Sequence, residues 1–124
     1  IQVADCLPVL FAAPGGIGIA AAHAGWRGLS AGVLEATVSA LCQATGCAAA
    51  ELEAWLGPCI GPRQFEVGAD VLAGFGVSQA TPHGRFKSHT SGKWLADLAG
   101  LARDRLAALG LERIEGGTWC TVEE

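Results

Sequence analysis

The 124-residue sequence contains no methionine, and only 16% of its residues are charged. No apolar stretch reaches the ~18 residues that a membrane-spanning helix needs, so we expect no membrane segment. The N-terminal residues lack the basic start and cleavage signature of a secretory signal peptide. The formal net charge of −4 argues against a nucleic-acid-binding surface. With 51% hydrophobic residues, the chain can bury the core of one domain over residues 1–124.

Paired cysteine motifs are also missing. The five cysteines show no CxxC spacing, and their number is odd; they are Cys6, Cys42, Cys47, Cys59 and Cys120. Without a secretory signal, this pattern indicates free thiols in a reducing compartment, so we predict a cytoplasmic protein. The sequence assigns no role to Cys42, Cys47 or Cys120.

The first third of the chain predicts a β-hairpin. Residues 9–13 and 17–22 are short apolar runs, typical of buried strands, and the Pro-Gly-Gly sequence between them is a turn signal. Strands joined by so short a connection are most simply antiparallel. Cys6 before the first strand and His23 after the second should therefore lie at the same end of the hairpin.

A glycine-flanked turn follows His23 and leads into a predicted helix over residues 29–45. Ser30 is a plausible N-cap and Gly46 a plausible residue just past the C-terminus. The free N–H groups at this helix start, together with Arg27, would form an anion site at the same end of the hairpin.

The remaining chain alternates short strands with helices. We expect strands at residues 53–56, 65–67 and 113–115, helices at 69–75 and 93–109, and a turn-rich segment over 77–91. His83 and His89 lie in that segment, where we expect them to be solvated. The prediction is an α+β fold with mixed β-sheets flanked by helices, without repeats or an interdomain linker.

Several readings of the hairpin end stay open on chemistry alone. A Cys6 thiolate and a His23 imidazole suit zinc, but a buried core cysteine beside an unrelated histidine fits the same spacing. Arg27 could bind phosphate through its guanidinium fork or pair with a carboxylate such as Asp5. Asp5 could instead orient a metal ligand or form a turn.

Five motifs occur in a fixed order: ADCLP at 4–8, HAGWRG at 23–28, LGPCIGP at 56–62, FEVG at 65–68 and CT at 120–121. Together they closely resemble the YfiH/LACC1 family, also called the polyphenol oxidase or multicopper laccase-like family. The resemblance covers nearly the whole chain and implies stacked α/β/β layers. Family members extend beyond both ends of this sequence, so we expect an internal fragment that supplies only part of those layers.

The resemblance implies a zinc-dependent purine nucleoside phosphorylase, which cleaves adenosine, inosine or guanosine with phosphate. It carries a metal site of two histidines and one cysteine onto Cys6 and His23, with the third ligand upstream of Ile1. Cys6, His23 and Arg27 would be catalytic, and Arg27, Trp26 and Cys59 would contact substrate. With one ligand absent and apolar faces uncovered, we expect the fragment by itself to be inactive.

The resemblance also implies adenosine deaminase activity alongside the phosphorylase, but the absence of an H-x-E signature weakens that assignment. Two other activities compete with the phosphorylase. A copper-dependent polyphenol oxidase needs many histidine ligands, and the three histidines form no HxH pair. A thiol hydrolase would use Cys6 as nucleophile and His23 as base. The preferred nucleoside and the oligomeric state stay open.

Overall fold

The computed structural model describes residues 7–57, 59, 65–77 and 84–117. Its main sheet has four strands in the order β2-β1-β3-β7. Their bounds are β1 Leu7–Ala12, β2 Ile19–Ala24, β3 Glu53–Leu56 and β7 Arg113–Gly116. β1 is antiparallel to both neighbours, whereas β3 and β7 are parallel, so the sheet is mixed.

The predicted hairpin is confirmed. A 3₁₀ turn at Pro14–Gly16 joins β1 to β2, and Pro8 lies opposite His23. The second strand begins two residues later than predicted and extends through His23 to Ala24. His23 is therefore part of a strand rather than of the turn after it.

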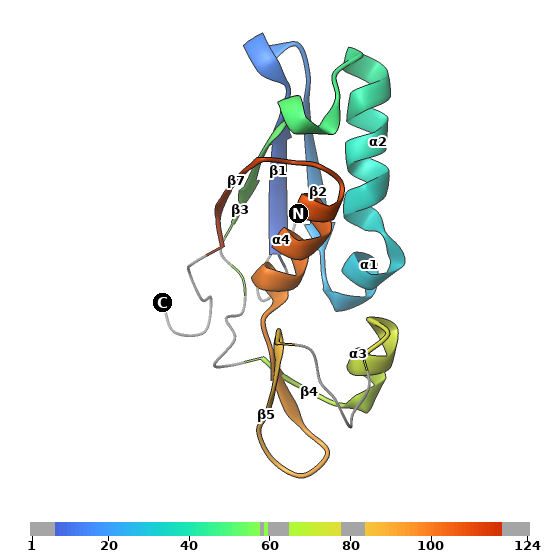
Figure 1. Ribbon diagram of the computed structural model, residues 1–124, viewed down its shortest axis with the longest axis vertical. Helices are drawn as coiled ribbons and strands as arrows, with labels where there is room; N and C mark the ends of the chain where they lie inside the picture. The colour runs from blue at the N-terminus through green and yellow to red at the C-terminus, as the bar shows by residue number, and fades with distance from the viewer. Residues whose placement is uncertain (1–6, 58, 60–64, 78–83, 118–124) are drawn as a thin grey trace.

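Helices cover one face of the main sheet. The alternation of β1 points Leu7, Val9 and Phe11 into the core, where they are almost completely buried. Helix α2 (Val33–Thr45) packs against β2 and also contacts α4 (Leu98–Ala108). Figure 1 shows both helices beside the same sheet.

The predicted helix over residues 29–45 is two helices. α1 spans Trp26–Ala31 with Gly25 as its N-cap, and α2 begins at Val33. Gly32 between them has φ +100°, a left-handed conformation that glycine adopts without a steric penalty. Ser30 is not an N-cap: its hydroxyl donates to the carbonyl of Arg27 at 3.1 Å.

A second, smaller sheet lies at the other end of the molecule (Figure 1). Its order is β4-β6-β5, with β4 Glu66–Val67, β5 Phe86–Ser88 and β6 Trp94–Ala96. Helix α3 (Ala69–Gly74) follows β4. Sequence analysis missed β5, because residues 77–91 carry many turn-forming residues.

The predicted helix over residues 93–109 begins later than expected. Residues 94–96 form β6, and the carboxylate of Asp97 then caps α4 by accepting the N–H of Gly100 at 3.0 Å. The short apolar run at 94–96 fits a strand or the start of a helix, so periodicity could not separate the two. The Asp97 cap is the signal that places the boundary.

Arg85 joins the small sheet to α4. Its guanidinium contacts Asp97 and Asp104, each at 3.0 Å. These hydrogen bonds, first those to Asp104, raise the pKa of Arg85 above its ordinary value. Arg103, also on α4, donates to the carbonyls of Ile114 and Gly116 on β7.

The observed mixture of two sheets and flanking helices confirms the predicted α+β fold class. None of the described helices combines the length and apolar character that crossing a bilayer requires.

Candidate functional site

Three chain segments that carry the sequence motifs meet at one end of the main sheet. Pro8 pairs with His23, and the N–H of Gly57 donates to the carbonyl of Pro8 at 2.8 Å. The N–H of Gly117 donates to the carbonyl of Leu56 at 2.8 Å, which brings the chain before the CT motif to the same end. Tertiary structure therefore gathers segments that are up to about a hundred residues apart in sequence.

His23 presents its side chain on the face that the helices leave open. Its neighbours Ala22 and Ala24 are buried, whereas His23 is exposed, as the alternation of a strand requires. Among the residues that the structure describes, the imidazole has no hydrogen-bond or ion-pair partner. An unshared imidazole on an open face can bind a metal ion.

Cys6 lies outside the described residues, so the predicted Cys6–His23 pair is not tested here. Leu7, the next residue, is opposite Ala24, which is the residue after His23. Within the described ranges, no group of three or more His, Cys, Asp or Glu side chains could hold a metal ion. The donor set of thiolate and imidazole still suits zinc, and the metal site stays a prediction.

Arg27 lies one residue into α1, close to the end of β2. A Cβ built on Gly28 would lie 3.8 Å from the carbonyl oxygen of His23, so this helix packs directly on the strand end. Arg27 is exposed and forms no ion pair with a described residue. Its predicted carboxylate partner, Asp5, is outside the described range. The guanidinium is therefore presented to solvent, as that of an anion-binding residue would be.

Trp26 is half-buried, and its indole lies between α3 and Arg27. The guanidinium carbon of Arg27 is 5.1 Å from the ring centroid, within the range of a cation–π contact. A Cβ on Gly74 would lie only 2.9 Å from Cζ3 of the ring. These contacts favour a packing role, and the predicted contact of Trp26 with substrate stays untested.

Cys59 is buried, with 1% of its surface exposed, and it belongs to the hydrophobic core. Its predicted contact with substrate stays untested, because most of the loop around it lies outside the described residues. Cys120 and His83 are also outside them. His89 is exposed, and its Nε2 atom lies 3.5 Å from a carboxylate oxygen of Glu66.

Sequence analysis missed an apolar surface on the open face of the main sheet. Leu10 is 51% exposed, Ile19 81% and Trp55 40%. They line a cavity of about 550 Å³, which Arg113 and Glu115 of β7 border. Residues 9–13 were expected to form a buried strand; Leu10, which is half exposed, shows that only one face of that strand is covered. The available signal was Trp55, an aromatic residue beside the charged Glu53.

The fold and this strand end define an α+β protein with a mixed sheet and an open, histidine-bearing face. The chain belongs to the family described as multi-copper polyphenol oxidoreductase laccase, whose family model matches residues 1–124. This confirms the resemblance stated from the motifs.

Curated relatives carry a different activity in their names. The chain is 52% identical over 127 residues to purine nucleoside phosphorylase YfiH of Escherichia coli. It is 50% identical over 125 residues to a purine nucleoside phosphorylase of Pseudomonas aeruginosa. Each alignment covers 100% of this chain but only 49% and 50% of those relatives, so the chain spans about half their length.

Solved structures show the same arrangement. A Neisseria meningitidis protein matches with a TM-score of 0.88 and 47% identity, over 98% of this chain and 48% of that one. YlmD of Geobacillus stearothermophilus matches with a TM-score of 0.87 and 29% identity, over 98% and 46%. The described elements therefore form a recurring part of a larger structure in both proteins.

Proposed function

We propose that the whole protein is a zinc-dependent purine nucleoside phosphorylase. The observation that carries the proposal is the gathering of the motif segments at one sheet end, with an unshared His23 and an exposed Arg27. The names of relatives at 50% and 52% identity support the same activity. A cytoplasmic location stays a prediction, as does adenosine deaminase activity.

The reaction transfers a ribosyl group from purine to phosphate. A phosphate oxygen forms a bond to ribose C1′ while the C–N bond to the purine breaks, and the purine takes up the proton that the phosphate loses. The products are the free base and ribose 1-phosphate. Phosphate must be held near C1′ with part of its charge neutralised, and an arginine fork does this with two parallel hydrogen bonds.

Arg27 is the residue of this chain that we assign to phosphate, since its guanidinium is exposed and unpaired by described carboxylates. His23 would hold zinc together with Cys6 and a histidine that precedes Ile1 in the family. Bound zinc would supply a Lewis acid that stabilises charge developing in the transition state. Trp26 and Cys59 remain candidate substrate contacts.

The test is an assay of the whole protein with inosine, with and without phosphate, and with metal content measured on the same sample. Phosphate-dependent release of hypoxanthine, lost on chelation and restored by zinc, is the expected result. The 124-residue chain assayed in parallel should be inactive. Equal rates for the two would contradict the assignment of a ligand outside this chain.

The family description favours a second candidate, a copper-dependent polyphenol oxidase. The same samples should therefore be loaded with copper and assayed for phenol oxidation. Oxidation of phenols without any cleavage of nucleosides would replace the phosphorylase proposal. Turnover that persists without metal and is lost on thiol alkylation would instead favour a Cys6 hydrolase.

A further inference from the structure

Trp26 packs against α3 at Gly74, a residue without a side chain. Gly74 is the last residue of α3, and a Cβ there would lie 2.9 Å from Cζ3 and 3.6 Å from Cε3 of the Trp26 ring. The same Cβ would be 3.7 Å from the hydroxyl of Ser30. The indole therefore occupies the space that any other residue at position 74 would need.

The end of α3 cannot easily retreat from the indole. Phe75, which follows Gly74, packs against Phe86 with ring centroids 5.9 Å apart. The guanidinium of Arg105, which is on α4, lies 5.5 Å from the centroid of the Phe75 ring. Arg105 also contacts Glu35 of α2 at 3.3 Å. Because neighbouring elements hold Phe75, a methyl group at position 74 must displace Trp26 instead.

Displacing Trp26 moves the indole ring that the guanidinium of Arg27 contacts. The guanidinium lies over the indole at 5.1 Å, and among the described residues this is its only recorded side-chain contact. An exposed arginine otherwise samples many rotamers, and holding it in one costs conformational entropy. An indole fixed by α3 restricts that sampling before an anion arrives.

We propose that Gly74 is a positioning residue, which lets Trp26 hold the guanidinium of Arg27 in its anion-binding orientation. This inference rests on the proposed function, because it takes phosphate as the anion that Arg27 binds. It assigns the indole to the arginine rather than to the purine. The packing of α3 against α1 thereby acts on phosphate affinity through Trp26.

The test compares Gly74→Ala with Gly84→Ala in the whole protein. Gly84 is a matched control because a Cβ there would meet nothing within 4 Å. Gly74→Ala should raise KM for phosphate about threefold, the scale of one exposed cation–π contact, with little change in kcat or in KM for the nucleoside. Gly84→Ala should leave all three constants unchanged.

A double-mutant cycle separates positioning from general damage. Trp26→Phe removes the outer ring that Gly74 faces, so Gly74→Ala should add no further rise in KM for phosphate on that background. An equal rise on both backgrounds would overturn the inference. So would a lowered melting temperature with KM for phosphate unchanged.

Two further measurements keep this result distinct from failure of the proposed function. If the wild type shows no phosphate dependence, the proposed function is wrong. If Arg27→Lys leaves phosphate dependence intact, the assignment of Arg27 to phosphate is wrong instead. The Arg27 Nε–H signal in NMR, recorded without phosphate, still reports the stacking itself. It should shift in Gly74→Ala and not in Gly84→Ala; no shift in either would show that Gly74 does not hold the guanidinium.

Discussion

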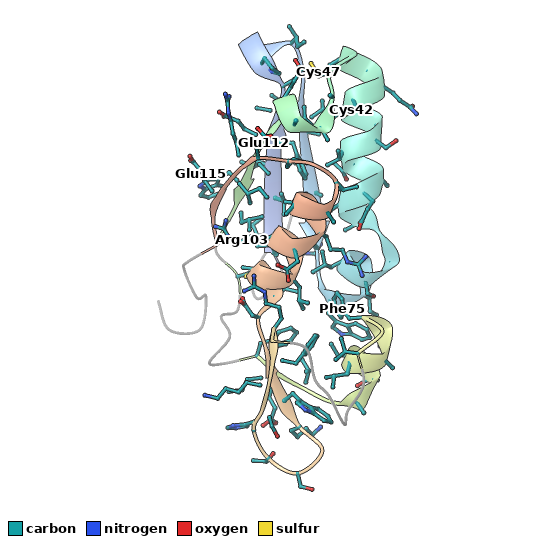
Figure 2. The ribbon with its side chains drawn as sticks, viewed as in Figure 1. Cys42, Cys47, Phe75, Arg103, Glu112 and Glu115 are labelled. Atoms are coloured by element: carbon teal, nitrogen blue, oxygen red, sulfur yellow. The ribbon has the colours of Figure 1, made fainter. Side chains whose placement is uncertain are left out.

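The two faces of the main sheet differ in what covers them. On one face, Leu7, Val9 and Leu56 have no exposed surface and belong to the core cluster that also contains side chains of α2 and α4. On the other face, Leu10 and Trp55 remain about half exposed, and His23 lies at the end of the same face. Figure 2 shows Glu115 on β7, the strand at the edge of the main sheet.

The residues that stabilise the fold therefore differ in location from the residues assigned to ligand binding. The covered face holds the large aliphatic side chains of the core, whereas His23, assigned to the metal, lies on the open face, and Arg27, assigned to phosphate, is exposed on α1. An apolar surface of this kind marks an interaction site in folded proteins. Changes on the covered face should therefore unfold the chain, and changes near His23 should alter ligand binding without unfolding it.

The largest expected effect is on the covered face. Leu56→Ala should lower the free energy of unfolding by about 3 kcal/mol, since it leaves a cavity at a completely buried site. Leu10→Ala, on the open face, should cost less than about 1 kcal/mol in the 124-residue chain. Denaturant titration of both variants measures the two losses in free energy of unfolding. Equal losses would contradict the difference between the two faces.

The same Leu10→Ala variant sharpens the comparison in the whole protein. If further chain covers the open face there, the loss should rise towards the value for Leu56→Ala. A loss that stays below about 1 kcal/mol would show that Leu10 is exposed in the whole protein too.

The next largest effect is on metal binding. His23→Ala should lower zinc content and reduce nucleoside cleavage about a hundredfold, the scale seen when metal-site interactions are lost. Its free energy of unfolding without metal should change by less than about 0.5 kcal/mol. His89→Ala is the control, because His89 is also exposed but lies beside Glu66 on the small sheet. Full zinc content in His23→Ala would remove His23 from the metal site.

A smaller effect is expected for the anion. Arg27→Lys should weaken phosphate binding about tenfold, because lysine lacks the bidentate fork, while the melting temperature stays nearly constant. Arg113→Lys serves as the control, since Arg113 is exposed and pairs with Glu53 at 3.5 Å. Calorimetric titration with phosphate measures both. A large fall in melting temperature with unchanged phosphate binding would assign Arg27 to the fold.

The smallest effect is expected for the ion pairs that link Arg85, next to the small sheet, to α4. Arg85→Met should cost about 1 kcal/mol, because the two carboxylate contacts of Arg85 are only partly shielded from water. Arg113→Met, which loses one exposed contact, should cost less. Thermal unfolding in low and high salt measures both losses, and salt should reduce the Arg85 contribution.

Local patterns predicted most of the main sheet. Strand β3 has the predicted bounds, and the β1–β2 hairpin follows from two apolar runs around Pro14–Gly16. Predictions failed where one pattern fits two structures. The apolar residues around Trp94 fit a helix or a strand, and pairing with β4 and β5 decided the strand. Gly32 was expected inside a helix, but its left-handed conformation separates two.

The sequence predicted which residue types form the candidate site, but only partly where those residues lie in the fold. The hairpin prediction brought His23 to the sheet end, and the motif order identified the family. Neither could show that Gly57 and Gly117 bring two distant segments to the same end, since such contacts depend on strand order. Likewise, nothing in the local sequence placed Trp26 against Gly74.

From sequence alone, the ordered motifs identified the family, and residue chemistry with short-range periodicity predicted the fold class and the candidate residues for metal and phosphate. These properties follow from side-chain type and from contacts within a few residues. Tertiary structure decided which sheet face is covered, which strands pair and which side chain supports Arg27. Those outcomes depend on how separate elements pack, because burial and steric exclusion act between residues that are distant in the chain.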